Sequence, residues 1–118
     1  MTNEDFEKIL LERVKKIGIL CTVKGEQYAT QKDRLHNFKS VAKQLNCTPE
    51  RALLGMVIKQ WTWIIDRVED LGFLHHPLAE WDERIGDVII YMILLGALRH
   101  EANEQDKRIT TKKSSQKV

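Results

Sequence analysis

Acidic residues gather in one short segment, residues 80–87, where four carboxylates occur in eight positions. Glu83 and Asp87 are four residues apart, so in a helix their carboxylates lie on one face, about one turn from each other. Carboxylates so placed suit Mg²⁺, which commonly also binds a substrate phosphate. The plainer interpretation is that acidic residues favour the start of a helix, with Asp82 as the N-cap.

Asp87 directly precedes an uncharged run, residues 88–98, where an unpaired charge would be costly. We therefore expect its carboxylate to have a partner. Lys59 stands close to Trp61 and Trp63, and its amine has two alternatives. It extends to water along its own stem, or it pairs with Asp87 or with a phosphate. The sequence leaves these alternatives open.

A long polar stretch, residues 21–32, and the segment after it contain four more candidates: Lys24, Tyr28, Arg34 and Asn37. Long loops in a compact domain often have a functional role. The ring of Tyr28 could stack on a base, and the cations Lys24 and Arg34 could contact phosphates. The plainer interpretation is a solvated connection between helices.

Helices must position these residues, because no alternation typical of strands runs for more than four residues. Apolar side chains recur at helical spacing in four segments: residues 3–20, 33–45, 49–71 and 80–102. The third segment has the clearest start, with Thr48 as N-cap and Pro49 in the first turn, and we expect Gly72 to stop it. The fold class we expect is all-α, a single domain resembling a four-helix bundle.

The chain has 118 residues and a net charge of +2, enough for one domain. The basic surplus lies in residues 104–118, which we expect to be a disordered tail after an all-α domain of residues 1–103. A near-neutral body argues against nucleic acid as a partner. Two cysteines without a CxxC motif, a polar start and no uncharged run long enough for a bilayer favour the cytoplasm, without a membrane partner.

The third and fourth predicted helices are apolar on more than one face, and a domain this small cannot cover all of that surface with its own residues. We therefore expect oligomerisation to complete the fold. The assembly would be a homodimer or a larger homo-oligomer formed through these two helices. Any ligand pocket would lie near the boundary between subunits.

Four short strings, taken together with Lys59 and Tyr91, resemble those of small phage and prophage proteins: residues 24–28 (KGEQY), 33–38 (DRLHNF), 52–56 (ALLGM) and 83–87 (ERIGD). More distantly, residues 20–100 resemble the nucleotide-modification-associated domains and the all-α nucleotide pyrophosphohydrolases of the MazG type. The resemblance implies a MazG-like helical fold and a nucleotide as ligand.

MazG-type enzymes hold Mg²⁺ with two carboxylate pairs, ExxE on one helix and ExxD on a later one. Asp87 matches the last acid, but Arg84 stands three residues before it and Glu83 one residue further back. Lys59 and Thr62 stand where the resemblance places the first pair. Losing these carboxylates removes most of the cage that would hold the cation against a triphosphate, so the sequence does not decide whether the protein is an enzyme.

Three hypotheses follow from the resemblance and the residues. In the first, the protein binds a nucleotide or a nucleotide-derived signal without turnover, and could sequester a defence messenger, through Lys24, Tyr28, Arg34, Asn37, Lys59, Asp87 and Tyr91. In the second, it is a divergent Mg²⁺-dependent nucleoside triphosphate pyrophosphohydrolase with Glu83 and Asp87, assisted by Glu80 or Glu26, as metal ligands. In the third, it is an interaction protein, such as an inhibitor of a host factor.

Overall fold

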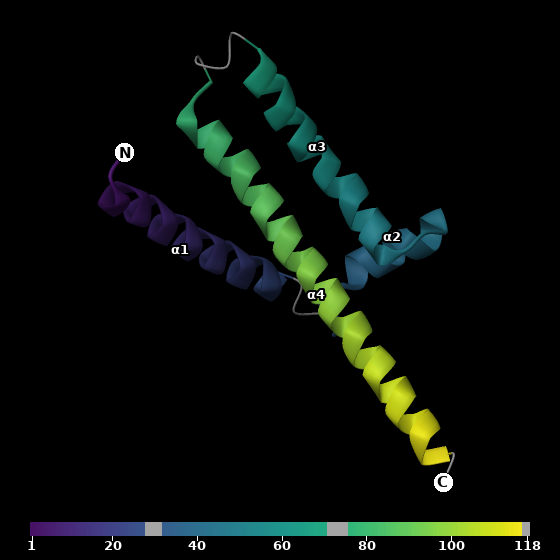
Figure 1. The fold of residues 1–118 in the computed structure, drawn as a ribbon. Coiled ribbons are helices and arrows are strands. Elements are labelled where there is room, and N and C mark those ends of the chain that lie inside the picture. The colour runs from purple at the N-terminus through teal and green to yellow at the C-terminus, as the bar shows by residue number, and fades with distance from the viewer. Residues whose placement is uncertain (28–31, 71–75, 117–118) are drawn as a thin grey trace.

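The computed structural model describes residues 1–27, 32–70 and 76–116. They form four helices: α1 (Asn3–Gln27), α2 (His36–Leu45), α3 (Pro49–Glu69) and α4 (Leu78–Gln116). Figure 1 shows α3 and α4 side by side and antiparallel, with α2 packed on α3 and α1 set against α4 alone. The described residues contain no strand, which confirms the all-α prediction.

The start of α3 follows the capping signals in the sequence. The Thr48 hydroxyl accepts a hydrogen bond from the Arg51 amide at 3.1 Å, and Pro49 occupies the first turn. The helix ends at Glu69, two residues before the expected end, and Gly72 lies outside the described residues. The fourth helix begins at Leu78, slightly earlier than expected.

The first helix is longer than the sequence predicts. It continues to Gln27, so the connecting loop expected over residues 21–32 is wrong for residues 21–27. The apolar period ends near Leu20, but a helix needs only its local hydrogen bonds to continue. Within this part, the Thr22 hydroxyl donates to the Gly18 carbonyl at 2.8 Å. Periodicity reports which residues are buried, and α1 is exposed along nearly all of its length.

The last helix also extends beyond its expected end. Residues 104–116 are helical where the sequence predicts a disordered tail. The side chains of residues 103–114 are all exposed, so no packing holds this part. The absence of large apolar side chains indicates that the segment joins no core, but its lysine, glutamine and glutamate residues are compatible with a helix. The domain division at residue 103 stays a prediction.

The core lies where α2 meets the α3–α4 pair. Its buried side chains are Leu35, Phe38, Leu53 and Leu98, and the half-buried Met56, Tyr91, Leu94 and Leu95 pack against them. At the other end of the pair, Trp63 packs edge to face on Trp81 with ring centroids 5.1 Å apart. The Arg67 and Arg84 guanidinium groups lie 5.1 and 5.3 Å from the centre of the Trp63 ring. These contacts fix both ends of the α3–α4 hairpin.

The molecule is extended, unlike the closed bundle that the sequence suggests. Its radius of gyration is 18.8 Å, whereas a compact chain of this length has about 13.5 Å. The projecting end of α4 and the loosely attached α1 produce this shape (Figure 1). Among the helices described, none has the length and hydropathy that a membrane crossing requires.

Candidate functional site

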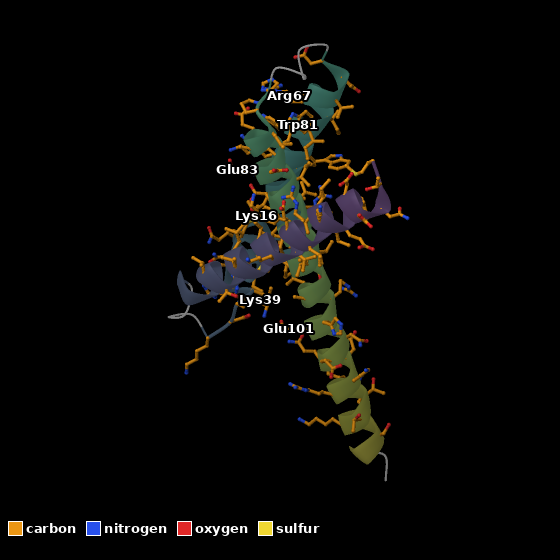
Figure 2. All side chains as sticks on the ribbon, turned by 90° about the vertical axis from the view of Figure 1, so that its left-hand side faces the viewer. Lys16, Lys39, Arg67, Trp81, Glu83 and Glu101 are labelled. Carbon is orange, nitrogen blue, oxygen red and sulfur yellow. The ribbon has the colours of Figure 1, made fainter. Side chains whose placement is uncertain are left out.

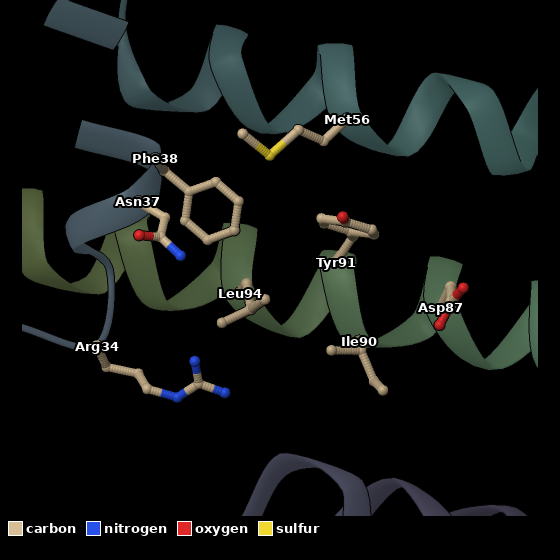
Figure 3. A pocket seen from close by; sticks show the side chains of 8 residues that line it. All are labelled: Arg34, Asn37, Phe38, Met56, Asp87, Ile90, Tyr91 and Leu94. Carbon is tan, nitrogen blue, oxygen red and sulfur yellow. The ribbon is translucent and has the colours of Figure 1, made fainter. Parts of the chain in front are cut away.

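A cavity of about 220 Å³ lies between α2, α3 and α4 (Figure 3). One face of α4 supplies half of its lining, because Asp87, Ile90, Tyr91 and Leu94 follow the spacing i, i+3, i+4, i+7. Arg34 lies just before α2, and Asn37 and Phe38 lie within its first turn. Met56 closes the cavity from α3.

The floor of the cavity consists of apolar side chains that pack closely against their neighbours. Phe38 is 7% exposed and Ile90 is 3% exposed. The Phe38 ring meets the Tyr91 ring edge to face, with centroids 6.4 Å apart and planes inclined by 70°. This contact holds the Tyr91 ring in place, so the cavity presents a rigid aromatic surface.

The rim of the cavity is polar. Arg34 and Asn37 are exposed and Asp87 is half-buried. Within the described residues, the Asp87 carboxylate has no hydrogen bond or ion pair, so the partner expected for it is not found among them. Figure 3 shows Arg34 and Asp87 toward opposite ends of the cavity. The α4 residues between them, 87 to 94, span ~10 Å of helix.

An ion-pair network holds the segment that bears Arg34. The Asp33 carboxylate accepts hydrogen bonds from the Leu35 amide and from the Lys39 amine, and Lys39 also pairs with Glu101 of α4 (Figure 2). The hydrogen bond from Lys39 lowers the pKa of the Asp33 carboxyl. The same bond, followed by that to Glu101, raises the pKa of the Lys39 amine. The network therefore ties the start of α2 to α4.

Lys59 does not belong to this cavity. Its side chain is exposed on α3, and no ion pair joins it to Asp87 within the part of the chain that the structure describes. Of the two alternatives for its amine, the structure therefore favours the one in which it extends to water. Lys24 and Glu26 lie in α1, but their side chains are not among those that the structure describes. Tyr28 lies outside the described residues.

The two carboxylates predicted to hold Mg²⁺ share a different cavity. Glu83 and Asp87 both line a wider space of about 780 Å³ between α1 and α4. Arg13 and Lys16 line the same space, and their positive charges compete with a cation there. The residues described contain no group of three or more His, Cys, Asp or Glu side chains that could hold a metal ion.

The remaining acids of this segment make structural contacts. Asp82 is not the N-cap of α4, because it lies in the second turn and pairs with Arg13 at 2.9 Å. Glu80 lies 3.3 Å from the His76 ring. Arg84 donates to the Gln60 side chain at 2.6 Å besides stacking on Trp63. Its role here is to join α4 to α3.

The structure brings together four of the seven residues predicted to bind a ligand: Arg34, Asn37, Asp87 and Tyr91. Sequence analysis missed the four apolar members, Phe38, Met56, Ile90 and Leu94. The helical spacing from Asp87 was a signal for Ile90 and Leu94, whereas nothing in the sequence pointed to Met56. No protein-family model matches the chain, and neither a curated protein nor a solved structure matches it.

Proposed function

We propose that the protein binds a nucleotide, or a molecule derived from one, in the cavity between α2, α3 and α4. The observation that supports this function is the placement of a guanidinium, an amide, a carboxylate and a phenol around one apolar floor. Small-molecule sites are typically concave, largely apolar and supplied with a few converging polar groups. This cavity has that composition.

The polar groups match the separate parts of a nucleotide. The Arg34 guanidinium suits a phosphate, which it can bind through two parallel hydrogen bonds. The Asp87 carboxylate accepts hydrogen bonds from the hydroxyl groups of a sugar or from the N–H groups of a base. The Asn37 amide both donates and accepts, so it could contact either part. The aromatic pair Phe38 and Tyr91 offers a surface for the base.

The size of the cavity indicates how much of the ligand it would enclose. Ligand sites commonly have roughly 300–1,000 Å³, and this one has about 220 Å³. We infer that it encloses the base and part of the sugar. The phosphates would then extend toward Arg34, whose exposed position keeps their charge in water.

Asp87 is the residue on which the proposal depends most. A half-buried carboxylate is costly unless hydrogen bonds satisfy it, and none does within the described residues. Donors on a ligand would supply those bonds.

Binding without turnover is the form of the hypothesis that the geometry favours. Glu83 lines the cavity with α1 and not the one with Arg34. Lys59 and Thr62, which stand in place of the first carboxylate pair, are both exposed. Nucleotide hydrolysis remains an outcome that the test below detects.

The test is a thermal-unfolding screen with nucleoside mono-, di- and triphosphates and cyclic nucleotides, without added metal. At a ligand concentration a hundredfold above Kd, binding adds about 2.7 kcal/mol of stability, on the order of 10 °C in Tm for a domain of this size. We expect the Asp87→Asn and Arg34→Gln variants to lose that shift while keeping the helical circular dichroism of the wild type. A mass spectrum of small molecules released from the freshly purified protein gives an independent readout.

The matched control is Glu83→Gln, one turn from Asp87 on the same helix, which removes the same charge without altering the cavity. It should keep the shift. Stabilisation that all three variants retain would place the ligand elsewhere and contradict the proposal. Release of pyrophosphate on addition of Mg²⁺ would favour the hydrolase instead, and no response to any nucleotide would favour the interaction protein.

A further inference from the structure

A row of large apolar side chains on α3 faces solvent. Its five members are 39–63% exposed: Leu54, Ile58, Trp61, Ile65 and Val68. They are spaced four, three, four and three residues apart, which is an average period of 3.5. This period is the signature of a helix that packs along a straight seam against another helix. We name these five residues the α3 seam.

The fourth helix adds apolar residues beside the α3 seam. Val88 and Met92 line a groove of about 420 Å³ together with Leu54, Val57, Ile58 and Trp61, and every side chain in it is apolar. Ile85, one heptad before Met92, is 36% exposed. The α3 seam and this part of α4 thus form one continuous apolar face.

This face points away from α1 and α2. Ile90 is buried at the cavity where α2 meets α4. Val88 and Met92 are two residues from it, so their side chains point ~160° away around the helix. No described residue of α1 or α2 lines the apolar groove.

We propose that a second copy of this chain covers the apolar face, with the two α3 helices antiparallel across a two-fold axis between Ile58 and Trp61. Because the spacings in the α3 seam alternate between four and three residues, reversing one copy about this point sets its apolar residues opposite those of the other. Antiparallel pairing then sets Ile58 of one copy against Trp61 of the other, and Leu54 against Ile65. A two-fold axis demands such a self-complementary surface.

The α3 seam itself carries no charge. Lys59 and Asp66, the exposed charged residues between Leu54 and Val68, lie ~120–140° around the helix from the centre of the seam. A second copy would therefore cover the seam without burying either charge.

The size of the face is of the order that a protein interface needs. The stretch from Leu54 to Val68 is ~21 Å long, and two packed helices are ~20 Å wide. The projected area is thus about 400 Å², and the corrugation of the side chains brings the accessible area nearer to the ~800 Å² per partner of a standard interface.

Light scattering on the full-length chain as it elutes from a size-exclusion column measures the mass of the assembly. We expect twice the 13.8 kDa chain mass at micromolar concentration. The Ile58→Glu variant should halve that mass, because it places a carboxylate in the seam. Ile109→Glu is the matched control, since Ile109 is similarly exposed but lies on the projecting end of α4. It should remain a dimer. A monomeric wild type, or equal behaviour of the two variants, would overturn the proposal.

Cysteine cross-linking tests the orientation. In a background with Cys21→Ser and Cys47→Ser, a mixture of the Leu54→Cys and Ile65→Cys chains is expected to form a disulfide-linked dimer under mild oxidation. Leu54→Cys alone should not. Cross-linking of Leu54→Cys to itself would indicate parallel helices, and no cross-linking of any variant would exclude the seam.

The two proposals can fail independently. Ile58 and Trp61 line the apolar groove and not the ligand cavity, which lies on the other side of the α3–α4 pair. Loss of the dimer in Ile58→Glu with an unchanged nucleotide shift would separate assembly from ligand binding. This arrangement also places the cavity away from the subunit boundary, in contrast to the expectation from the sequence.

Discussion

Asp87 lies at the junction of the two cavities that flank α4. Its side chain lines the cavity with α2 and α3 and also the one with α1. A carboxylate in this position has little structural role, because no described residue pairs with it. Removing its charge should therefore leave the free energy of unfolding unchanged or increase it, whereas ligand binding should be lost. That opposition between stability and binding is typical of functional residues.

The ion pairs of Lys39 make the stability of the fold depend on pH. Its amine bonds to Asp33 and Glu101, each about one-third exposed. The lowered pKa of Asp33 stabilises the fold above about pH 3.9, the ordinary value, and this contribution disappears as the pH falls through the lower folded value. The raised pKa of Lys39 stabilises below about pH 10.4, and its contribution disappears as the pH rises through the higher folded value.

Lys39→Met should therefore cost on the order of 1 kcal/mol at pH 7, since exposed ion pairs are weak. Thermal unfolding of the wild type and the variant should show a gap in Tm that shrinks from pH 5 toward pH 3 and again above pH 11. Lys43→Met is a control on the same helix, because Lys43 makes no ion pair within the described residues. A gap that stays constant from pH 3 to pH 11 would contradict this assignment.

At the scale of the elements, α1 depends on a few polar contacts. Arg13 donates to the Asp82 carboxylate at 2.9 Å and to the Asp82 carbonyl at 2.8 Å. The absence of a side chain at Gly86 permits this approach, because a Cβ there would lie 3.2 Å from the Arg13 guanidinium. The apolar residues of α1 contribute little, and Phe6, Ile9 and Val14 are at least half exposed.

Arg13→Ala should release α1 without unfolding the α3–α4 hairpin. We expect amide hydrogen exchange in α1 to accelerate more than tenfold, with exchange in α3 and α4 unchanged. Lys16→Ala is the control, since Lys16 lines the same cavity but makes no ion pair in the described part of the chain. Equal protection of α1 in both variants would show that its apolar contacts suffice to hold it.

At the scale of the whole molecule, the end of α4 projects beyond the packed part. The side chains of residues 103–114 are exposed, whereas Glu101 and Ala102 are partly buried. Removal of residues 104–118 should therefore leave Tm within about 3 °C of the full chain, the effect of a change of up to ~0.5 kcal/mol. Thermal circular dichroism of the shortened chain checks this. A larger decrease would show that the segment supports the body and would shift the domain boundary.

The proposed dimer also bears on the shape of the molecule. A second copy on the α3 seam would bury apolar side chains that a single chain exposes, and it would leave the ligand cavity of each copy accessible. The exposed stripe of α1 would remain outside this interface. Small-angle scattering by the dimer should thus show an elongated particle with two projecting α4 ends.

The sequence alone predicts the features that depend on residues close together along the chain. Thr48 and Pro49 predict the start of α3, since a cap depends on neighbours a few residues away. The all-helical fold follows from apolar spacing, and the face of α4 that contains Asp87 and Tyr91 follows from 3.6 residues per turn. These features involve short separations along one helix.

Other features depended on how the helices lie against one another. Lys59 faces water, and Arg34 and Asp87 line the same cavity. Both facts depend on how α2 and α3 are rotated about their own axes, which the periodicity of the sequence does not specify. The stripe on α1 predicts burial, yet α1 packs on α4 alone. Hydrophobic spacing indicates that a face needs a partner but does not say which surface provides it, and that choice arises from contacts between residues distant in the chain.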